Sequence, residues 1–478
     1  MTHVRERALQ LCLALCVVVG SARAGTVTLA DQGASPVTVR KKPSNDSLAV
    51  GQLKAGEQAE LIDEVPYWYK VRLPDGTEGY ASKAKTVASE ESAAPSGPTP
   101  GSESAHDETP AGTGSHGDGN GVVTVKQVFR VSDLSTAPPA PGTYRIHLID
   151  VGTGMSVLVQ GADFNLLFDG GSRDEKRKIS GSGNGNRLLS YLYAVLGPSG
   201  PPECVPEGDD WGAPGTGERT INHLVLSHPH EDHNSLLPDV LHCYHVENVW
   251  ESGINSPTGT QGAFVQAAVD EPGVHYHTAA EDSHGLEVEI GDKVVSIPAG
   301  LERDTFGRGD QEPLGVGAKF IIVHADPVQH GTDFNLNSIV LRVELGKRTL
   351  LLTGDTESGD RRPPSAAPAR AEQEMLETDP ALLDADILQV AHHGSKTSSR
   401  RAFLDAVSPL WALVSSGPFK YSGVKLPDPE ILEELRKVGA VVLATDVNDG
   451  RCPVEDRIGL DSAKAPGGCD NYVLEIRP

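Results

Sequence analysis

The stretch Ser227-His228-Pro229-His230-Glu231-Asp232-His233 decides how this sequence is interpreted. It ends the apolar run at 223–227, which predicts a buried strand, so its polar side chains are expected on a loop at a sheet edge. Three imidazoles and a carboxylate within six residues suit zinc or a similar divalent ion. They are too many for one four-coordinate ion that keeps an open position, so two bound ions are the natural interpretation.

Two later segments have the same form, an apolar strand followed by metal-ligand residues. Leu350-Leu351-Leu352-Thr353-Gly354-Asp355 ends in a carboxylate, which is placed to bridge two ions. Ile387-Leu388-Gln389-Val390-Ala391-His392-His393-Gly394-Ser395 ends in a pair of histidines. Because they follow the first cluster in this order, both segments are predicted to complete the same site.

These motifs resemble those of metallo-β-lactamase-fold hydrolases over residues 144–478, and within that superfamily those of the ComEC competence proteins of DNA uptake. That branch reads D-V-G-x-G, L-x-D-x-G, S-H-x-H-x-D-H, N-x-x-S-x-V-L, L-L-T-G-D and H-H-G-S-x-x-S. The matching segments here are Asp150-Val151-Gly152-Thr153-Gly154, Leu167-Phe168-Asp169-Gly170-Gly171, the cluster at 228–233, Asn335-Leu336-Asn337-Ser338-Ile339-Val340-Leu341, Leu351-Leu352-Thr353-Gly354-Asp355 and the segment 392–398.

The resemblance implies an α/β fold, the αββα sandwich of this superfamily, and assigns a role to each motif residue. His228 and His230 would hold the first ion, and Asp355 would bridge to the second. The ligands of the second ion would be Asp232, His233 and His393. Asp169 matches a buried aspartate that orients the histidine loop from the second shell. His392 is the other candidate ligand, or a group that hydrogen-bonds the substrate or leaving group.

The resemblance also implies two divalent ions, with Zn²⁺ favoured and Mn²⁺ the alternative, and a metal-bridged hydroxide as nucleophile. Asp232 would accept a hydrogen bond from that hydroxide. A phosphodiester is well served by paired ions, but a carboxylic ester, thioester or lactam would use the same apparatus. The ligands alone therefore leave the reaction open.

Three positions depart from the related sequences. Asn335 lies near the place where other branches carry a further histidine, so it is expected in the second shell and the first ion is expected to be weakly held. Met155 stands where the competence branch usually has Asp, and Tyr421-Ser422-Gly423-Val424-Lys425-Leu426-Pro427 replaces its Y-G-H-P motif.

Residues 26–87 predict a small all-β barrel, because short alternating strands are separated by turn signals such as Pro74-Asp75-Gly76. The segment resembles bacterial SH3-type domains. The matching positions are Thr38-Val39-Arg40-Lys41-Lys42-Pro43-Ser44, Leu53-Lys54-Ala55-Gly56, Trp68-Tyr69-Lys70-Val71 and Gly79-Tyr80-Ala81. The resemblance implies binding of a cell-wall peptide, and a spacer without a ligand is the alternative.

Residues 88–141 form a predicted Ser/Gly/Pro-rich disordered linker, because up to about residue 120 they have too few large apolar side chains to offset the entropy of ordering. A strand is nevertheless expected over 122–131. The hydrolase domain is predicted over 142–478. Its predicted elements include helices at 187–196, 401–407 and 429–438 and a hairpin around Gly346-Lys347.

Residues 1–24 have the form of a secretory signal peptide, with Arg5 and Arg7 before an apolar stretch and Ala22-Arg23-Ala24 as the cleavage site. We therefore expect a secreted or periplasmic protein without a transmembrane span after cleavage. Four cysteines would remain, an even number that suits disulfides in an exported chain. Of the three pairings, Cys204–Cys243 and Cys452–Cys469 are favoured because each ties a nearby loop.

The net charge of −25 argues against a broad basic surface that would hold nucleic acid by neutralising its phosphates. A secreted nuclease is nevertheless the first hypothesis, with nucleic acid or another phosphodiester as substrate. A local basic rim is expected from Lys396, Arg400, Arg401, Lys420 and Lys425. The alternatives are a cell-envelope phosphodiesterase or ester hydrolase positioned by the SH3-type domain, and a binding protein whose ions are structural.

Overall fold

The computed structural model describes most of the chain. The described residues are 25–29, 36–42, 48–65, 68–82, 86–90, 114–118, 120–172, 187–205, 219–256, 258–279, 287–290, 293–296, 301–417, 420–421, 423–447, 458 and 468–478. The predicted signal peptide, 1–24, lies outside them. The chain divides into two compact units, Met1–Asp107 and Glu108–Pro478.

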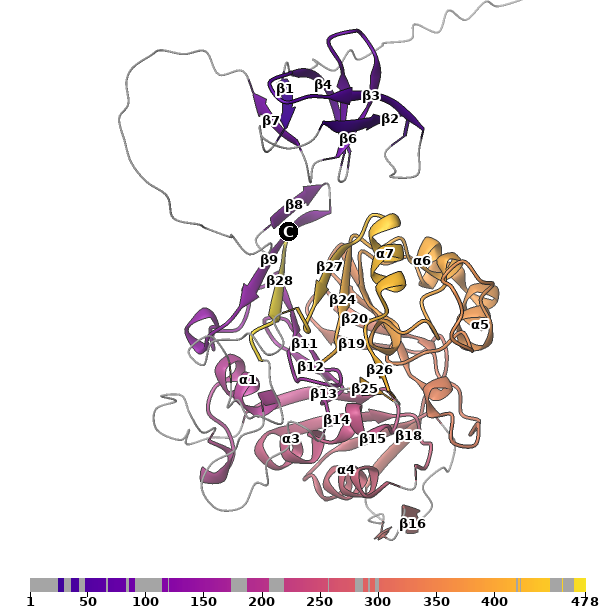
Figure 1. The fold of residues 1–478 in the computed structure, drawn as a ribbon. Helices are drawn as coiled ribbons and strands as arrows, with labels where there is room; N and C mark the ends of the chain where they lie inside the picture. The colour runs from indigo at the N-terminus through magenta and orange to yellow at the C-terminus, as the bar shows by residue number, and fades with distance from the viewer. Residues whose placement is uncertain are drawn as a thin grey trace, which may run out of the picture. The chain divides into compact units, whose positions relative to one another are not determined.

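The first unit is all-β, as predicted for its SH3-type segment (Figure 1). Its strands pair antiparallel in the order β3-β2-β6-β5-β4-β1-β7. Val27, Val39, Leu53 and Val71 form its core, because strand side chains alternate between the packed and the exposed face. The strands are β1 Gly25–Leu29, β2 Val37–Arg40, β3 Ala49–Leu53, β4 Ala59–Val65, β5 Trp68–Arg72, β6 Glu78–Ser82 and β7 Thr86–Glu90.

The second unit contains two large mixed sheets. The described strands of the first lie in the order β18-β15-β14-β13-β12-β11-β10-β28-β9-β8, and those of the second in the order β19-β20-β21-β22-β23-β24-β27. The first sheet consists of β8 Gly114–Asp118, β9 Gly121–Val128, β10 Tyr144–Leu148, β11 Val157–Gln160, β12 Asn165–Phe168, β13 Thr220–Leu226, β14 His245–Glu251, β15 His275–Thr278, β18 Glu302–Thr305 and β28 Asn471–Arg477.

The second sheet and the minor strands complete the β-structure of this unit. They are β19 Gln311–Gly315, β20 Ala318–His324, β21 Val340–Leu345, β22 Arg348–Leu352, β23 Ile387–Gln389, β24 Trp411–Val414, β27 Val441–Ala444, and the short pairs β16 Glu287–Ile290 with β17 Lys293–Ser296 and β25 Lys420–Tyr421 with β26 Val424–Lys425. The helices are α1 Arg187–Leu196, α2 Glu231–Asn234, α3 Leu237–Cys243, α4 Gly259–Asp270, α5 Arg370–Thr378, α6 Arg401–Val407 and α7 Pro429–Lys437.

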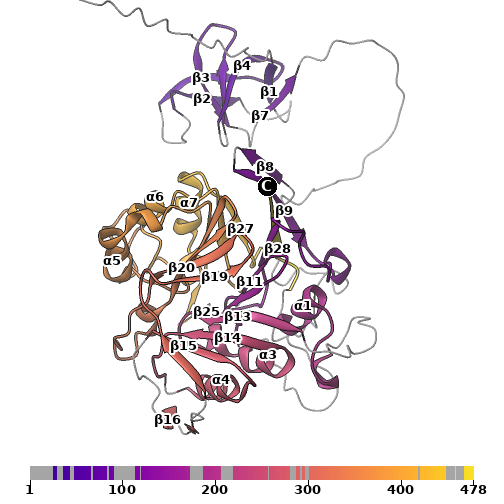
Figure 2. The same cartoon turned by 180° about the vertical axis from the view of Figure 1, so that it is seen from behind.

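The two sheets pack face to face with helices outside, which confirms the predicted αββα sandwich (Figures 1 and 2). Alternation along the strands produces the layers: Leu166 and Phe168 of β12 lie in the core between the sheets, whereas Leu167 packs against α1, α3 and α4. In the same way Leu350 of β22 faces the other sheet, and Leu351 packs under α5, α6 and α7.

The predicted boundary of the hydrolase domain is corrected by β9. This strand pairs with β28 from Val122↔Arg477 to Val128↔Asn471, and its Val123 and Val125 are buried, so residues 121–128 belong to the sheet rather than to a disordered linker. The strand expected over 122–131 is thereby confirmed as far as Val128, and Val131–Asp133 forms a short 3-10 helix. β8, at Gly114–Asp118, pairs with β9, so residues 114–118 of the predicted linker also belong to this sheet.

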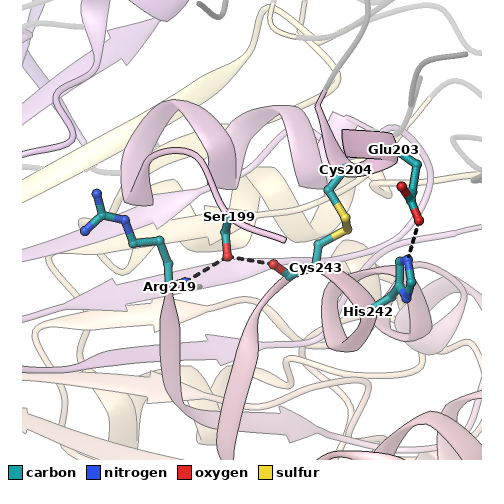
Figure 3. The surroundings of a disulfide bond; sticks show 6 residues. All are labelled: Ser199, Glu203, Cys204, Arg219, His242 and Cys243. Atoms are coloured by element: carbon teal, nitrogen blue, oxygen red, sulfur yellow. Dashed lines mark hydrogen bonds and ion pairs between the residues drawn. A yellow bond between two sulfur atoms is a disulfide. The ribbon is translucent and has the colours of Figure 1, made fainter. Parts of the chain in front are cut away.

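One predicted disulfide is present. Cys204 and Cys243 are bonded, and beside them Ser199 Oγ accepts from the Arg219 N–H and donates to the Cys243 carbonyl oxygen (Figure 3). Cys469 is also disulfide-bonded. Its predicted partner, Cys452, lies outside the described residues, so that pairing stays a prediction. Within the described part of the chain, no helix is long and apolar enough to cross a membrane.

Candidate metal centre

The candidate site lies where four strands end. β12 runs parallel to β13 and β22 runs parallel to β23, so within each pair the carboxyl ends meet at the same edge of the sheet. The chain continues from these ends into Asp169, Ser227, Asp355 and His392, as the apolar runs before them predicted.

Direct contacts join the two sheets at this edge. Ser227 O, at the end of β13, accepts from Ile339 N, just before β21, at 2.9 Å. Within the second sheet, Ser338 Oγ accepts from Asp355 N at 3.1 Å. Gly354 makes the approach possible: its φ is +54°, and a Cβ there would lie 2.8 Å from the Ser227 Cβ. The glycine of the L-L-T-G-D motif is therefore required by packing.

Asp232, His233, Asp355 and His393 form one compact group. Each offers a ligand atom, and these atoms all lie within 4.8 Å of one another. The Asp355 carboxylate is central, because its Oδ2 lies 3.3 Å from His233 Nε2 and 3.4 Å from His393 Nε2. Asp232 Oδ2 lies 3.2 Å from His393 Nε2. Three sequence segments, the first more than 120 residues from the second, thus meet at one place.

Asp169 fixes the orientation of this group. The buried carboxylate accepts from Ser227 N, Ser227 Oγ and His233 Nδ1, each at 2.7 Å. Because Nδ1 of His233 donates to Asp169, Nε2 is directed toward Asp355 and Asp232, where it can hold either a proton or a metal ion. The supporting role predicted for Asp169 agrees with this geometry.

His393 is oriented in the same way from the other sheet. Its Nδ1 donates to the Ser415 carbonyl oxygen at 2.8 Å, which directs its Nε2 toward Asp232 and Asp355. Its ring also stacks on Tyr421, with centroids 5.2 Å apart. Of the paired histidines, His393 therefore has the position of a ligand, as the sequence favoured.

The arrangement fits divalent ions. His233 Nε2 and Asp355 Oδ1 are buried and have no hydrogen-bond partner among the described residues. Imidazole lone pairs and carboxylate oxygens are all acceptors, so when they converge in a buried group they repel unless protons or cations lie between them. Mixed nitrogen and oxygen ligands of this kind suit zinc and its neighbours.

The pKa shifts of His393 and Asp355 also indicate a site for bound positive charge. Burial lowers the pKa of His393, but Asp355 and Asp232 outweigh it and raise this pKa to about 10. Burial raises the pKa of Asp355, yet the positive forms of His393 and His233 hold it well below its usual range. The group therefore favours bound positive charge, which protons or metal ions can supply.

His228 and His230, the predicted ligands of the first ion, lie beside this group but outside it. His228 is fully buried and contacts Ser227 Oγ through Nδ1 at 3.0 Å. Its Nε2 lies 2.9 Å from His230 Nδ1, so in this arrangement a hydrogen bond joins the two rings. Burial, the largest effect, keeps the pKa of His228 well below its usual value, so the ring is neutral and able to act as a ligand.

Glu357 is a site residue that the sequence analysis missed. Its Oε1 lies 2.9 Å from His392 Nδ1 and accepts from Asn335 Nδ2 at 3.2 Å. Asn335 therefore reaches the metal group only through Glu357 and His392, as a supporting residue. The sequence feature that could have identified Glu357 is its spacing, because it follows Asp355 by two residues at the same strand end.

The predicted basic rim is wrong in part. Arg400 is 1% exposed, and its guanidinium donates to the carbonyl oxygens of Asp360, Arg362 and Pro363. Lys396 pairs with Glu430 at 2.8 Å, and Arg401 pairs with Asp405 and Glu434. These charges are buried or neutralised locally, so they provide little free attraction for phosphates.

Two face-to-face sheets with histidines and carboxylates at their strand ends define a metallohydrolase. Residues 149–417 match the metallo-beta-lactamase superfamily, and because this match covers more than half of the chain, the chain belongs to that superfamily. Residues 35–87 match the bacterial SH3 domain. Both resemblances inferred from the motifs are thereby confirmed.

Curated relatives include competence proteins. Recombination protein 2 of Haemophilus influenzae is 26% identical over 325 residues, which cover 67% of this chain and 30% of the relative. Uncharacterized protein YcaI of Escherichia coli is 36% identical over 61% of this chain and 28% of its own length. Competence protein ComA of Neisseria gonorrhoeae is 34% identical over 24% of this chain and 15% of its own length. This chain thus spans less than a third of each relative.

Proposed function

We propose that this metallo-β-lactamase-fold hydrolase cleaves phosphodiesters of nucleic acid outside the cytoplasm. The observation that carries the proposal is the convergence of Asp232, His233, Asp355 and His393, whose imidazole nitrogens and carboxylate oxygens lie within 4.8 Å of one another at the ends of both sheets. A buried site of this charge suits two ions, and paired ions suit in-line displacement at phosphorus.

Each residue would have a defined task. Asp232, His233 and His393 would hold one ion, His228 and His230 the other, and Asp355 would bridge them. Bound ions would lower the pKa of a coordinated water and stabilise negative charge at the attacked phosphorus. Asp232 Oδ2 would accept a hydrogen bond from the attacking water, since it is 18% exposed while the rest of the group is buried.

His392 would serve the leaving group. Its Nδ1 is held by Thr397 Oγ1 at 2.7 Å and by Glu357 Oε1 at 2.9 Å. The Glu357 carboxylate and the Thr397 hydroxyl orient the ring, and Nε2–H would donate to the departing oxygen. His392 is 19% exposed, so a substrate can reach it.

Nucleic acid is supported by relatives named for recombination and for competence. The net charge of −25, together with the burial of Arg400 and the pairing of Lys396 and Arg401, means that contact with phosphates would depend mainly on the ions. Export is supported by the Cys204–Cys243 disulfide, since such bonds persist in oxidising compartments.

The test is hydrolysis of single-stranded DNA by the whole chain with Mn²⁺ or Zn²⁺ added. Cleavage is expected, with loss in Asp355→Ala and His230→Ala. His242→Ala is the matched control, because this exposed histidine pairs with Glu203 at 3.5 Å near the disulfide and should leave activity unchanged (Figure 3). No cleavage with either metal rejects the nuclease assignment.

A second candidate is a cell-envelope phosphodiesterase or ester hydrolase directed by the SH3 domain. The observation that favours it is the domain itself, a compact unit with its own core, to which none of Asp232, His233, Asp355 and His393 belongs. Retention of the whole chain on peptidoglycan, lost when residues 26–87 are deleted, together with hydrolysis of envelope phosphodiesters rather than DNA, would favour this candidate.

A further inference from the structure

A second group of histidines and a carboxylate lies on the strands β15 and β18. The two strands pair in parallel, and β18 is the first strand in the described order of its sheet. His275 and His277 are two positions apart on β15, so their side chains share one face. Asp304 lies directly opposite His277 in the register. No residue of this group belongs to the metal centre described above.

The ligand-type atoms of the group converge. His277 Nδ1 contacts Asp304 Oδ1, and His275 Nε2 lies 3.4 Å from Asp304 Oδ2. The two imidazole rings are 4.3 Å apart. One ligand atom from each of the three residues lies within 4.8 Å of the others, as in the first centre.

The ring of His277 is held in one orientation. It stacks on Trp250, with centroids 3.6 Å apart and an interplanar angle of 7°. Its Nε2 lies 3.1 Å from Asn248 Oδ1, while Asn248 Nδ2 donates to the Asn222 carbonyl oxygen at 2.9 Å. Because the amide nitrogen is used there, the amide oxygen faces His277, and Nε2 of the ring must carry the proton.

This orientation leaves the Nδ1 lone pair of His277 facing the Asp304 carboxylate. Two acceptors at hydrogen-bond distance repel each other unless a second proton or a cation lies between them. His275 adds a third group that can donate a lone pair to the same point. A hydrogen bond that fixes the outer nitrogen of a histidine is also the usual support of a metal ligand.

We propose that His275, His277 and Asp304 form a second metal site that takes a divalent first-row ion, with Zn²⁺ best suited to two imidazoles and one carboxylate. Three protein ligands leave one tetrahedral position for water. All four residues of β18 are exposed, so an ion shared with β15 would fasten this strand to the sheet. The proposal is independent of the reaction at the first centre.

The experiment measures zinc bound per chain by the whole protein at pH 7.5 after dialysis, in an Asp355→Ala background that weakens the first centre. Adding His275→Ala or Asp304→Asn is expected to remove one zinc equivalent per chain. Adding His242→Ala, which removes an exposed histidine paired with a single carboxylate, is expected to remove none. His275 is 37% exposed, so its loss should not endanger folding.

A second readout is the thermal midpoint with and without added Zn²⁺. Zinc is expected to raise it in the Asp355→Ala chain and in the His242→Ala control, and to raise it less after His275→Ala. Equal zinc content in all three chains, or no zinc retained by the Asp355→Ala chain, overturns the proposal. Either result identifies the group as histidines in contact with Asp304 and without an ion, and leaves the hydrolytic function unaffected.

Discussion

Replacement of Asp169 by Asn tests how the metal centre is oriented. The carboxylate accepts three hydrogen bonds, two from Ser227 and one from His233 Nδ1. An amide has one oxygen, which would keep the bond from Ser227 N. Its nitrogen would then face His233 Nδ1, so the imidazole proton would move to Nε2, the atom that faces Asp355.

The expected loss of zinc affinity follows from the loss of the His233 Nε2 lone pair as a metal ligand. Removing a supporting partner of this kind costs about 10- to 100-fold in metal affinity, or ~1.4–2.8 kcal/mol. One weakened bond to a buried charged group also lowers the free energy of unfolding by about 1–3 kcal/mol. We therefore expect Asp169→Asn to fold, and to bind zinc at least tenfold more weakly than the parent.

The assay is a zinc titration against a chelator of known affinity, with unfolding in urea measured in parallel. Asp386→Asn is the matched control, because that carboxylate accepts from Arg348 and from Thr349 N but has no histidine partner. It should lose a similar amount of stability and no zinc affinity. Unchanged zinc affinity in a folded Asp169→Asn chain would refute this account of the tautomer.

Three further outcomes are expected. Burial lowers the pKa of His147 to about 3, below its unfolded value near 6.5, so its contribution is present above pH 6.5 and is lost as the pH falls. Between pH 7 and 5 the parent should lose ~2 kcal/mol more of its unfolding free energy than His147→Gln, and parallel urea profiles would contradict this. Glu357→Gln removes the charge beside His392, so kcat for the cleaved substrate should fall about 10- to 100-fold with KM little changed; an unchanged kcat would exclude the contact from catalysis. The disulfide Cys204–Cys243 closes a separation of 39 residues, so the paired alanine variant should be less stable by ~4 kcal/mol, and equal thermal midpoints would argue against this.

Local patterns were enough to predict the centre of the fold. The apolar runs before Asp355 and before His392 were assigned as strands, and β22 and β23 lie there. The ligands could be found because each follows directly on such a run, and the carboxyl ends of neighbouring parallel strands meet at one edge. The helices α1, α6 and α7 also lie where local sequence patterns predict helices, at 187–196, 401–407 and 429–438.

Features that depend on distant pairing were not predictable. β9 becomes part of the sheet only through β28, which lies more than 340 residues later in the chain. Arg400 is expected at the surface from its charge. It is buried because the carbonyl oxygens of Asp360, Arg362 and Pro363, on a separate loop, accept its hydrogen bonds, and the local sequence does not show this. Glu357 was missed for a similar reason: its role becomes visible only when the loop after β22 is seen beside His392.

The paired histidines after β23 adopt a left-handed backbone conformation that residues with a side chain disfavour. His392 and His393 have φ values of 49° and 54°, a left-handed conformation that costs a residue with a Cβ about 1–3 kcal/mol. Glycine or asparagine would adopt it at less cost. A library of variants screened for heat resistance alone should therefore be enriched in glycine and asparagine at positions 392 and 393. The selected chains should be more thermostable but inactive.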